Sequence, residues 1–130
     1  MRLEIKIDSV RSIARMRVFG VWDVSEFSAR LTELTDHPDF KPGMPAIWDM
    51  RDADLAGMTK GDMLAAGEKS RQLADRRGNA RVAFVVPDDL RFGMARMPQV
   101  VGRSPNLDIQ VFRDFAAAEA WIAESPGSDD

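Results

Sequence analysis

Two continuous apolar runs are the feature that most constrains the fold of this chain. Residues 46–48 read A-I-W, residues 81–86 read R-V-A-F-V-V, and the first run stops abruptly at Asp49. Successive side chains of a strand point to opposite faces, so a strand that is apolar at successive positions is buried on both faces. We therefore predict that these two strands form the centre of a sheet with helices packed against it, the first strand ending at Asp49.

The remaining strands show a different pattern, in which apolar and polar residues alternate. Leu3, Ile5 and Ile7 alternate with charged residues, and a second alternating run covers residues 14–18. A period of two indicates half-buried strands, and the polar turn between these two predicts an opening β-hairpin that Gly20 ends. Residues 107–111 also alternate, so we predict an edge strand there.

Four helices are predicted between and after the strands, starting near Asp23, Thr59, Asp88 and Asp114. Asp23 stands three residues before Glu26, a spacing typical of a capping pair, and Asp36-His37-Pro38 should close that helix. The second helix is expected to run from residue 59 to about residue 76. The third is a short helix over residues 88–97. The fourth presents an apolar stripe with Glu119 at its flank, made of Phe115, Ala118 and Ile122.

The predicted order of elements is β-β-α-β-α-β-α-β-α. Alternating strands and helices indicate an α/β fold with a mixed, mainly parallel sheet, parallel from the third strand onward, and right-handed crossovers. A chain of 130 residues fits one domain, which we assign to residues 1–124, with a disordered tail at residues 125–130.

Composition excludes several classes of function. The net charge is −3 and the pI about 5.2, which disfavours nucleic acid and anionic membranes as partners. There is no cysteine and only one histidine, which excludes disulfides, thiolate catalysis, iron–sulfur clusters and a zinc site, and we expect no cofactor. The alternating N-terminus is predicted to be a strand and not a signal peptide, and no apolar run is long enough for a membrane span, so a cytoplasmic location is expected.

Four motifs in this order resemble a known family. They are F-K-P-G-M-P-A-I-W-D-M-R at 40–51, R-V-A-F-V-V at 81–86, R-F-G-M-A-R-M at 91–97, and V-F-R-D-F-A-A-A-E-A-W-I at 111–122. The chain resembles the SpoIIAA-like family, relatives of the STAS domains of anti-sigma-factor antagonists, and more closely the small bacterial proteins of STAS/SEC14 type. The resemblance implies a SpoIIAA-like single domain with a binding or regulatory role.

Thr59 is the first candidate residue that the resemblance suggests. Anti-sigma-factor antagonists carry a phosphorylatable serine at the start of the helix after the central strand. The equivalent stretch here reads L-A-G-M-T-K-G-D, which offers Thr59 without that serine motif. A phosphate on Thr59 would lie at the positive end of a helix dipole. The favoured interpretation is that Thr59 caps the helix by accepting a hydrogen bond near Asp62.

The charged cluster after the first central strand is the second candidate. Asp49, Asp52 and Asp54 could supply oxygen ligands to a hard cation, but Arg51 lies among them and no calcium-loop motif is present. We therefore expect carboxylates paired with arginine and no metal. Asp49 could equally accept amide hydrogen bonds in the chain that follows it.

The segment from residue 90 to residue 101 is the third candidate. It follows the second central strand, and we expect it to border the same edge of the sheet as Asp49. Methionine, aromatic and basic side chains in it suit recognition, although they are also typical of a segment that simply covers the sheet. The candidate residues in this segment are Arg91, Phe92, Met94 and Arg96.

These observations favour a binding or regulatory module that engages a protein partner or a small ligand at the carboxyl edge of the central strands, and a homodimer is left open. The alternative is a carrier of a small molecule or lipid, or less favourably an enzyme, acting on an anionic ligand through Asp49, Arg51 and Arg96. A catalyst needs a positioned acid–base or nucleophilic pair. The sequence offers none, so we expect no catalytic residue and no enzyme activity.

Overall fold

A computed structural model describes residues 1–73, 80–86 and 107–124. The described strands and helices are β1 (Arg2–Asp8), β2 (Ile13–Val21), α1 (Val24–Asp36), β3 (Ala46–Asp54), α2 (Lys60–Gln72), β4 (Ala80–Val85), β5 (Leu107–Phe112) and α6 (Phe115–Ala123).

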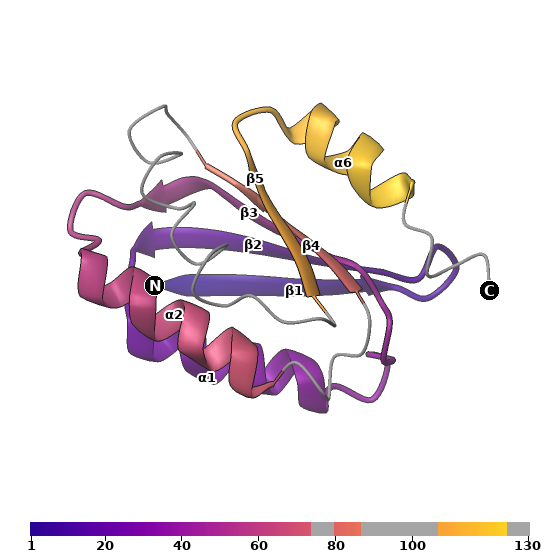
Figure 1. Ribbon diagram of the computed structural model, residues 1–130, viewed down its shortest axis with the longest axis horizontal. Helices are drawn as coiled ribbons and strands as arrows, with labels where there is room; N and C mark the ends of the chain where they lie inside the picture. Colours follow the sequence, from indigo (N-terminus) through magenta and orange to yellow (C-terminus); the bar gives the residue numbers. More distant parts are fainter. Residues whose placement is uncertain (74–79, 87–106, 125–130) are drawn as a thin grey trace.

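The strands form one five-stranded sheet in the order β1-β2-β3-β4-β5 (Figure 1). β1 and β2 pair as an antiparallel hairpin, and every later neighbour is parallel. β3 therefore lies at the centre with β4 beside it, and β1 and β5 form the two edges. This arrangement confirms the predicted hairpin, the mainly parallel sheet and the edge position of residues 107–111.

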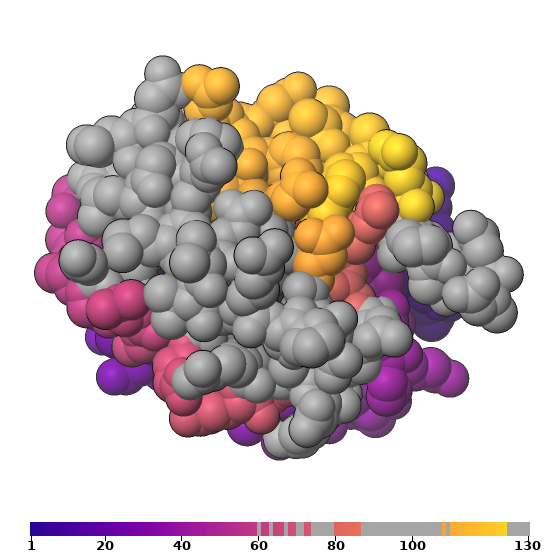
Figure 2. All heavy atoms as spheres, in the orientation of Figure 1, coloured from indigo at the N-terminus to yellow at the C-terminus, as the bar shows by residue number. Residues whose placement is uncertain are grey.

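Helices cover the two faces of the sheet unequally. α1 and α2 lie together on one face, which we call the inner face, and α6 lies on the other, the outer face (Figure 1). α6 contacts β3, β4 and β5, and its atoms form one continuous surface with those of β5 (Figure 2). The outer side of β1 and much of β2 is left without a covering helix among the described elements.

The inner face holds the larger core. Trp48 of β3 is fully buried and packs against Phe27 of α1, with ring centroids 4.9 Å apart, and against Phe84 of β4 at 6.1 Å. A second, smaller core lies on the outer face, where Ile47 packs beneath Ala118 and Ile122 of α6. Neighbouring residues of one strand thus belong to two different cores, as the continuous apolar run predicts.

Capping interactions fix where the helices begin and end. The Asp23 carboxylate accepts a hydrogen bond from the backbone N–H of Glu26 at 3.0 Å, which confirms the predicted start of α1. α1 ends at Asp36, where the backbone N–H of His37 donates to Leu34 and Pro38 follows. The Asp114 carboxylate caps α6 in the same way, accepting from Ala116 at 3.1 Å.

Several predicted boundaries differ from the structure, among them β4, which is shifted by one residue from the predicted 81–86. β3 does not end at Asp49 but continues to Asp54, because Met50 is buried and Ala53 packs against the inner core while Arg51 and Asp52 stay exposed. β2 runs one residue past Gly20, and α2 ends at Gln72 rather than near residue 76. The helix predicted over residues 88–97 and the tail at 125–130 lie outside the described residues.

Candidate binding site at the carboxyl end of the central strands

The site begins where β3 loses one of its two neighbours. Asp49 is the last β3 residue in register with β4, where it lies beside Val85, and on its other side it lies beside Arg17 of β2. Beyond Asp49, the pairing of β3 within the described residues is with β2 alone. There the register shifts, so that two β3 residues stand opposite one residue of β2.

Asp49 is the only charged or polar side chain that is buried among the described residues, with a residue exposure of 7%. Its two carboxylate oxygens accept hydrogen bonds from Nε and Nη2 of Arg51, each at 2.8 Å. The backbone N–H of Arg51 also donates to the same carboxylate, at 3.2 Å. This two-pronged pairing is the geometry in which a guanidinium binds a carboxylate most specifically.

The electrostatics of this pair favour the charged forms of both residues. Burial acts to raise the pKa of Asp49, but the side-chain and backbone hydrogen bonds from Arg51, with the charges of Arg51 and Arg17, outweigh it and hold the pKa below its ordinary value. The hydrogen bonds that Arg51 donates to Asp49 raise the pKa of Arg51 in turn. Asp49 is therefore a fixed negative charge, which suits it to hold Arg51 and makes it a weak base.

Arg51 is presented toward solvent although Asp49 is buried. Its side chain is 48% exposed, and its guanidinium carbon lies 4.6 Å from the centre of the Phe115 ring, a cation–π contact with the first residue of α6. Two contacts from different elements therefore fix the guanidinium plane.

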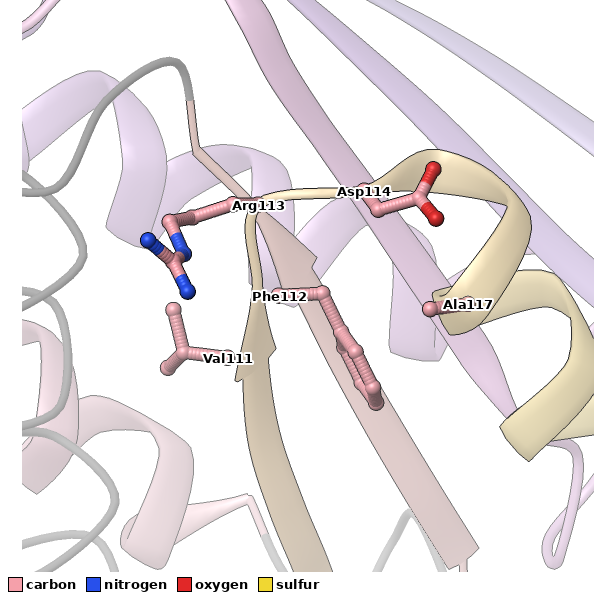
Figure 3. A pocket seen from close by; sticks show the side chains of 5 residues that line it. All are labelled: Val111, Phe112, Arg113, Asp114 and Ala117. Atoms are coloured by element: carbon pink, nitrogen blue, oxygen red, sulfur yellow. The ribbon is translucent and has the colours of Figure 1, made fainter.

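A shallow hollow lies at the junction between β5 and α6. It has a volume of about 460 Å³ and is lined by Val111, Phe112, Arg113, Asp114 and Ala117. Figure 3 shows Val111 and Arg113 extending to one side of β5, while Phe112 extends toward α6. Asp114 contributes to the electrostatic environment of Arg51, so the hollow and the Asp49–Arg51 pair belong to the same end of the sheet.

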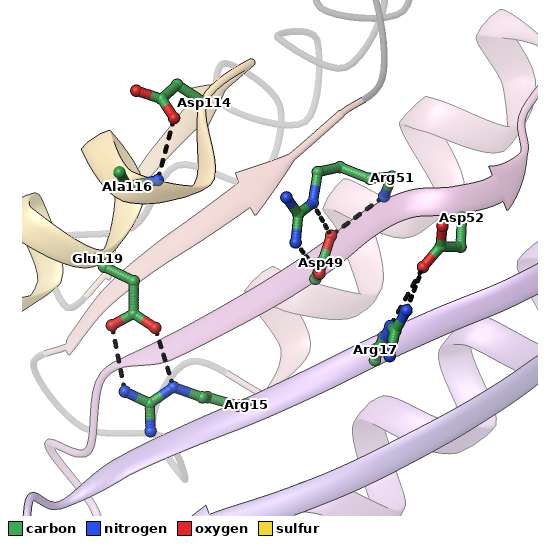
Figure 4. A network of polar contacts seen from close by, with 8 residues as sticks. All are labelled: Arg15, Arg17, Asp49, Arg51, Asp52, Asp114, Ala116 and Glu119. Atoms are coloured by element: carbon green, nitrogen blue, oxygen red, sulfur yellow. Dashed lines mark hydrogen bonds and ion pairs between the residues drawn. The ribbon is translucent and has the colours of Figure 1, made fainter.

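Two further ion pairs extend the charged region across the outer face (Figure 4). Arg17 of β2 donates to Asp52 of β3 at 2.7 Å, and both side chains are about half exposed. Arg15 of β2 donates through Nε and Nη2 to the two oxygens of Glu119, each at 3.1 Å, and so ties β2 to α6. Asp49 and Asp52 thus each form an ion pair with an arginine, as the sequence predicts.

Thr59 forms a reciprocal cap with Asp62. The Thr59 hydroxyl accepts a hydrogen bond from the backbone N–H of Asp62 at 3.1 Å, and the Asp62 carboxylate accepts one from the backbone N–H of Thr59 at 3.0 Å. The predicted cap is confirmed. α2 belongs to the inner layer, so the structure does not bring Thr59 into the outer-face cluster of Asp49, Arg51 and Asp52.

The other predicted site residues, Arg91, Phe92, Met94 and Arg96, lie outside the described residues. Phe115, Asp114 and Arg17 also contribute to the site, although they are not among the residues predicted from the sequence. Phe115 was assigned to the apolar stripe of the last helix, and Asp114 was seen only as its cap. The signal for Arg17 was present, because alternation in residues 14–18 turns Arg15 and Arg17 to the face opposite the core.

In the described part of the chain, no three histidine or acidic side chains come together in a way that could hold a metal ion. No helix of that part is long and apolar enough to cross a membrane.

A mainly parallel five-stranded sheet opened by a hairpin, with two helices on one face and the last helix on the other, defines an α/β domain with the SpoIIAA-like fold. The chain is similar in structure to an uncharacterized protein from the DUF3478 family with a SpoIIAA-like fold from Shewanella loihica PV-4. The match has a TM-score of 0.60 and 17% sequence identity, and covers 92% of this chain and 93% of the other. No family model matches the sequence, and no curated protein is significantly similar to it.

Proposed function

We propose that this domain is a binding or regulatory module that engages an acidic group of a protein partner or small ligand through Arg51 and the adjoining hollow. The observation that carries the proposal is the way Asp49 and Phe115 hold a half-exposed guanidinium at the carboxyl end of the central strands. Ligands of open α/β sheets commonly bind at that end.

The chemistry of Arg51 suggests what it would bind. Nε and Nη2 are committed to Asp49, which leaves Nη1 without a hydrogen-bond partner among the described residues. A planar guanidinium that is already oriented loses little side-chain entropy when it binds a carboxylate or phosphate. An acidic side chain of a protein, or the anionic group of a small ligand, is therefore the matching chemistry.

The same contacts argue for binding rather than catalysis. A general base needs a pKa near the working pH, whereas the Arg51 contacts hold the pKa of Asp49 below its ordinary value. Arg17 and Asp52 are committed to each other. Within the described residues we find no acid–base or nucleophilic pair that faces the hollow.

The proposal is tested by comparing proteins captured by the wild type and by two matched variants. Arg51→Lys keeps a positive charge beside Asp49 but removes the planar, two-pronged contact. Arg30→Lys is the control, because Arg30 is also a partly exposed arginine engaged with carboxylates, on α1. Quantitative mass spectrometry of material captured from a bacterial lysate should show a partner that Arg30→Lys retains and Arg51→Lys loses. Capture that is equal for all three proteins would contradict the proposal.

A small-molecule carrier is the second candidate, and one observation favours it. The indole N–H groups of Trp22 and Trp48 are buried and have no hydrogen-bond partner in the described part of the chain. Buried donors are usually satisfied, so either a bound molecule or residues outside the described part would supply the missing acceptors. Native mass spectrometry of the purified protein should then show a bound mass that is released on denaturation. Its absence would leave the binding module as the remaining candidate.

A further inference from the structure

β1 is an edge strand with an unusual symmetry. Its seven residues read R-L-E-I-K-I-D. The charged residues alternate in sign on the outer side, and Leu3, Ile5 and Ile7 lie on the inner side, where they are partly buried against the core. If the strand is turned end for end about Ile5, each charge meets a charge of opposite sign and each apolar residue meets an apolar residue.

We propose that β1 is a dimerisation surface, on which a second copy of this chain adds its own β1 in antiparallel orientation. A two-fold axis at Ile5 would join two five-stranded sheets into one. Arg2 would then face Asp8 of the other copy, Glu4 would face Lys6, Leu3 would face Ile7, and Ile5 would face its own equivalent.

The backbone permits this register. Alternate residues of an edge strand turn their N–H and C=O groups away from the sheet. The proposed pairs are always two even-numbered or two odd-numbered residues, so outward-facing groups of one copy meet outward-facing groups of the other. At about 3.3 Å per residue, the paired strands would run side by side for roughly 23 Å.

Neighbouring registers are disfavoured by charge. A shift of two residues in one direction places Glu4 against its own equivalent and Arg2 against Lys6. The opposite shift places Lys6 against its own equivalent and Glu4 against Asp8. Like charges directly opposite each other destabilise a strand pair. Among these three registers, only the one centred on Ile5 is complementary at every charged position, and it also pairs all seven residues.

Glu4 and Lys6 have different neighbours on β2. Glu4 lies directly opposite Arg17, a neighbour of opposite sign whose guanidinium is bound by Asp52. Lys6 lies directly opposite Arg15 of β2, a neighbour of the same sign. Neither Glu4 nor Lys6 forms an ion pair within the described residues. Arg2 and Asp8, at the two ends of the strand, are partly engaged already. Arg2 lies over the Phe19 ring at 4.8 Å, and Asp8 accepts hydrogen bonds from the backbone N–H groups of Val10 and Arg11.

Charged side chains on an edge strand also discourage indiscriminate pairing. Charges of a single sign would serve that purpose equally well and would repel a second copy. The opposite edge shows the contrast: β5 carries a single charge, Asp108, and turning it end for end about its midpoint produces no complementary charge pairs. The alternating, symmetric charges of β1 therefore favour pairing with a copy of itself.

The proposal is tested by reversing the charges of Glu4 and Lys6 one at a time. Glu4→Lys places the introduced lysine against Lys6 of the other copy, and Lys6→Glu places two carboxylates together. Each occurs twice per dimer, so each single variant should raise the dimer dissociation constant about tenfold or more. The double variant Glu4→Lys/Lys6→Glu should restore it. An equimolar mixture of the two single variants should form a mixed dimer, because the introduced charges complement each other.

Sedimentation equilibrium over a concentration series measures these constants, and circular dichroism checks that each variant is folded. Asp108→Lys on β5 is the matched control, since it makes the same change in charge as Glu4→Lys on the other edge and should leave the constant unchanged. The mixture also guards against misfolding, because unfolded variants could not restore each other. A wild type that is monomeric throughout, or single variants with the wild-type constant, would overturn the proposal.

Discussion

The sheet has one part that is covered on both faces and one part that is covered on only one. Among the described elements, β3 and β4 lie between α1 and α2 on the inner face and α6 on the outer face, whereas β1 and much of β2 have helices on the inner face alone. Ile47 of β3 is 1% exposed on the outer face, but Arg17 of β2 on the same face is about half exposed.

This difference separates stability from recognition. Apolar residues on both sides of β3 contribute burial energy that a surface strand cannot match. The outer side of β1 and β2 instead carries charged side chains, of which Arg15 and Arg17 are engaged in ion pairs that add little to stability. The proposed binding residue, Arg51, lies at the boundary between the two parts, where the buried Asp49 can hold it and solvent can still reach it.

The largest effect should follow from placing a charge in the doubly covered part. Ile47→Asp would bury a carboxylate beneath Ala118 and Ile122, beside Arg15, whose guanidinium is already bound by Glu119. We expect a loss of several kcal/mol in the free energy of unfolding, measured by urea denaturation. A loss below about 1 kcal/mol would show that α6 does not seal this part of the sheet.

A smaller effect is expected at the boundary. Asp49→Asn removes the charge that receives Arg51, and we expect a loss of about 2 kcal/mol at pH 7. The pKa of Asp49 is lower in the folded state, so its contribution is complete above the unfolded pKa of about 3.9 and is lost as the pH falls through the lower, folded pKa. Unfolding curves of both proteins should therefore converge as the pH drops below about 4. A difference that does not depend on pH would contradict this assignment.

The Thr59 cap should contribute less. Thr59→Ala removes the hydroxyl that accepts from Asp62, and we expect a cost of about 1 kcal/mol in thermal or urea unfolding. Thr59→Ser keeps the hydroxyl and should be nearly silent. Stoichiometric phosphate on Thr59 in protein isolated from its native host would contradict a role limited to capping.

The smallest effect belongs to the ion pair that crosses from the singly covered part to α6. A double-mutant cycle on Arg15→Ala and Glu119→Ala should give a coupling free energy of about 0.5 kcal/mol. The reason is that both side chains are still roughly 30% exposed to solvent. A coupling of several kcal/mol would mean that this pair, and not apolar packing, attaches α6 to the sheet.

The fold could be predicted from the sequence because its signals are local and periodic. The continuous run around Ile47 and the strict alternation of Leu3, Ile5 and Ile7 report how many faces of each strand are covered. Caps such as Asp23 and Asp114 need only a spacing of two or three residues. Each of these patterns reflects an interaction between near neighbours in the chain.

The candidate site was predicted only in part, because its contacts depend on register. The sequence shows that Asp49 and Arg51 are close together, but not that Asp49 is buried or that Arg51 lies over Phe115. Arg17 and Asp52 are 35 residues apart, and only the pairing of β2 with β3 brings them together. The predicted end of β3 was wrong for a related reason. A run of charged residues resembles a loop unless it is known that one face of the strand is exposed.

The register shift in β3 also predicts where the deletion of a single residue would disturb the fold. Up to Asp49 the outer-facing residues are odd-numbered, but after the extra residue Asp52 lies beside Phe19 on the outer face and Ala53 packs inward. Deleting one residue at Met50 or Arg51 would restore regular pairing with β2. The strand would then lose either Met50, which packs in the inner core, or Arg51, which binds Asp49. We therefore expect single-residue deletions to be tolerated in the β1–β2 turn and to destabilise the fold at this point of β3.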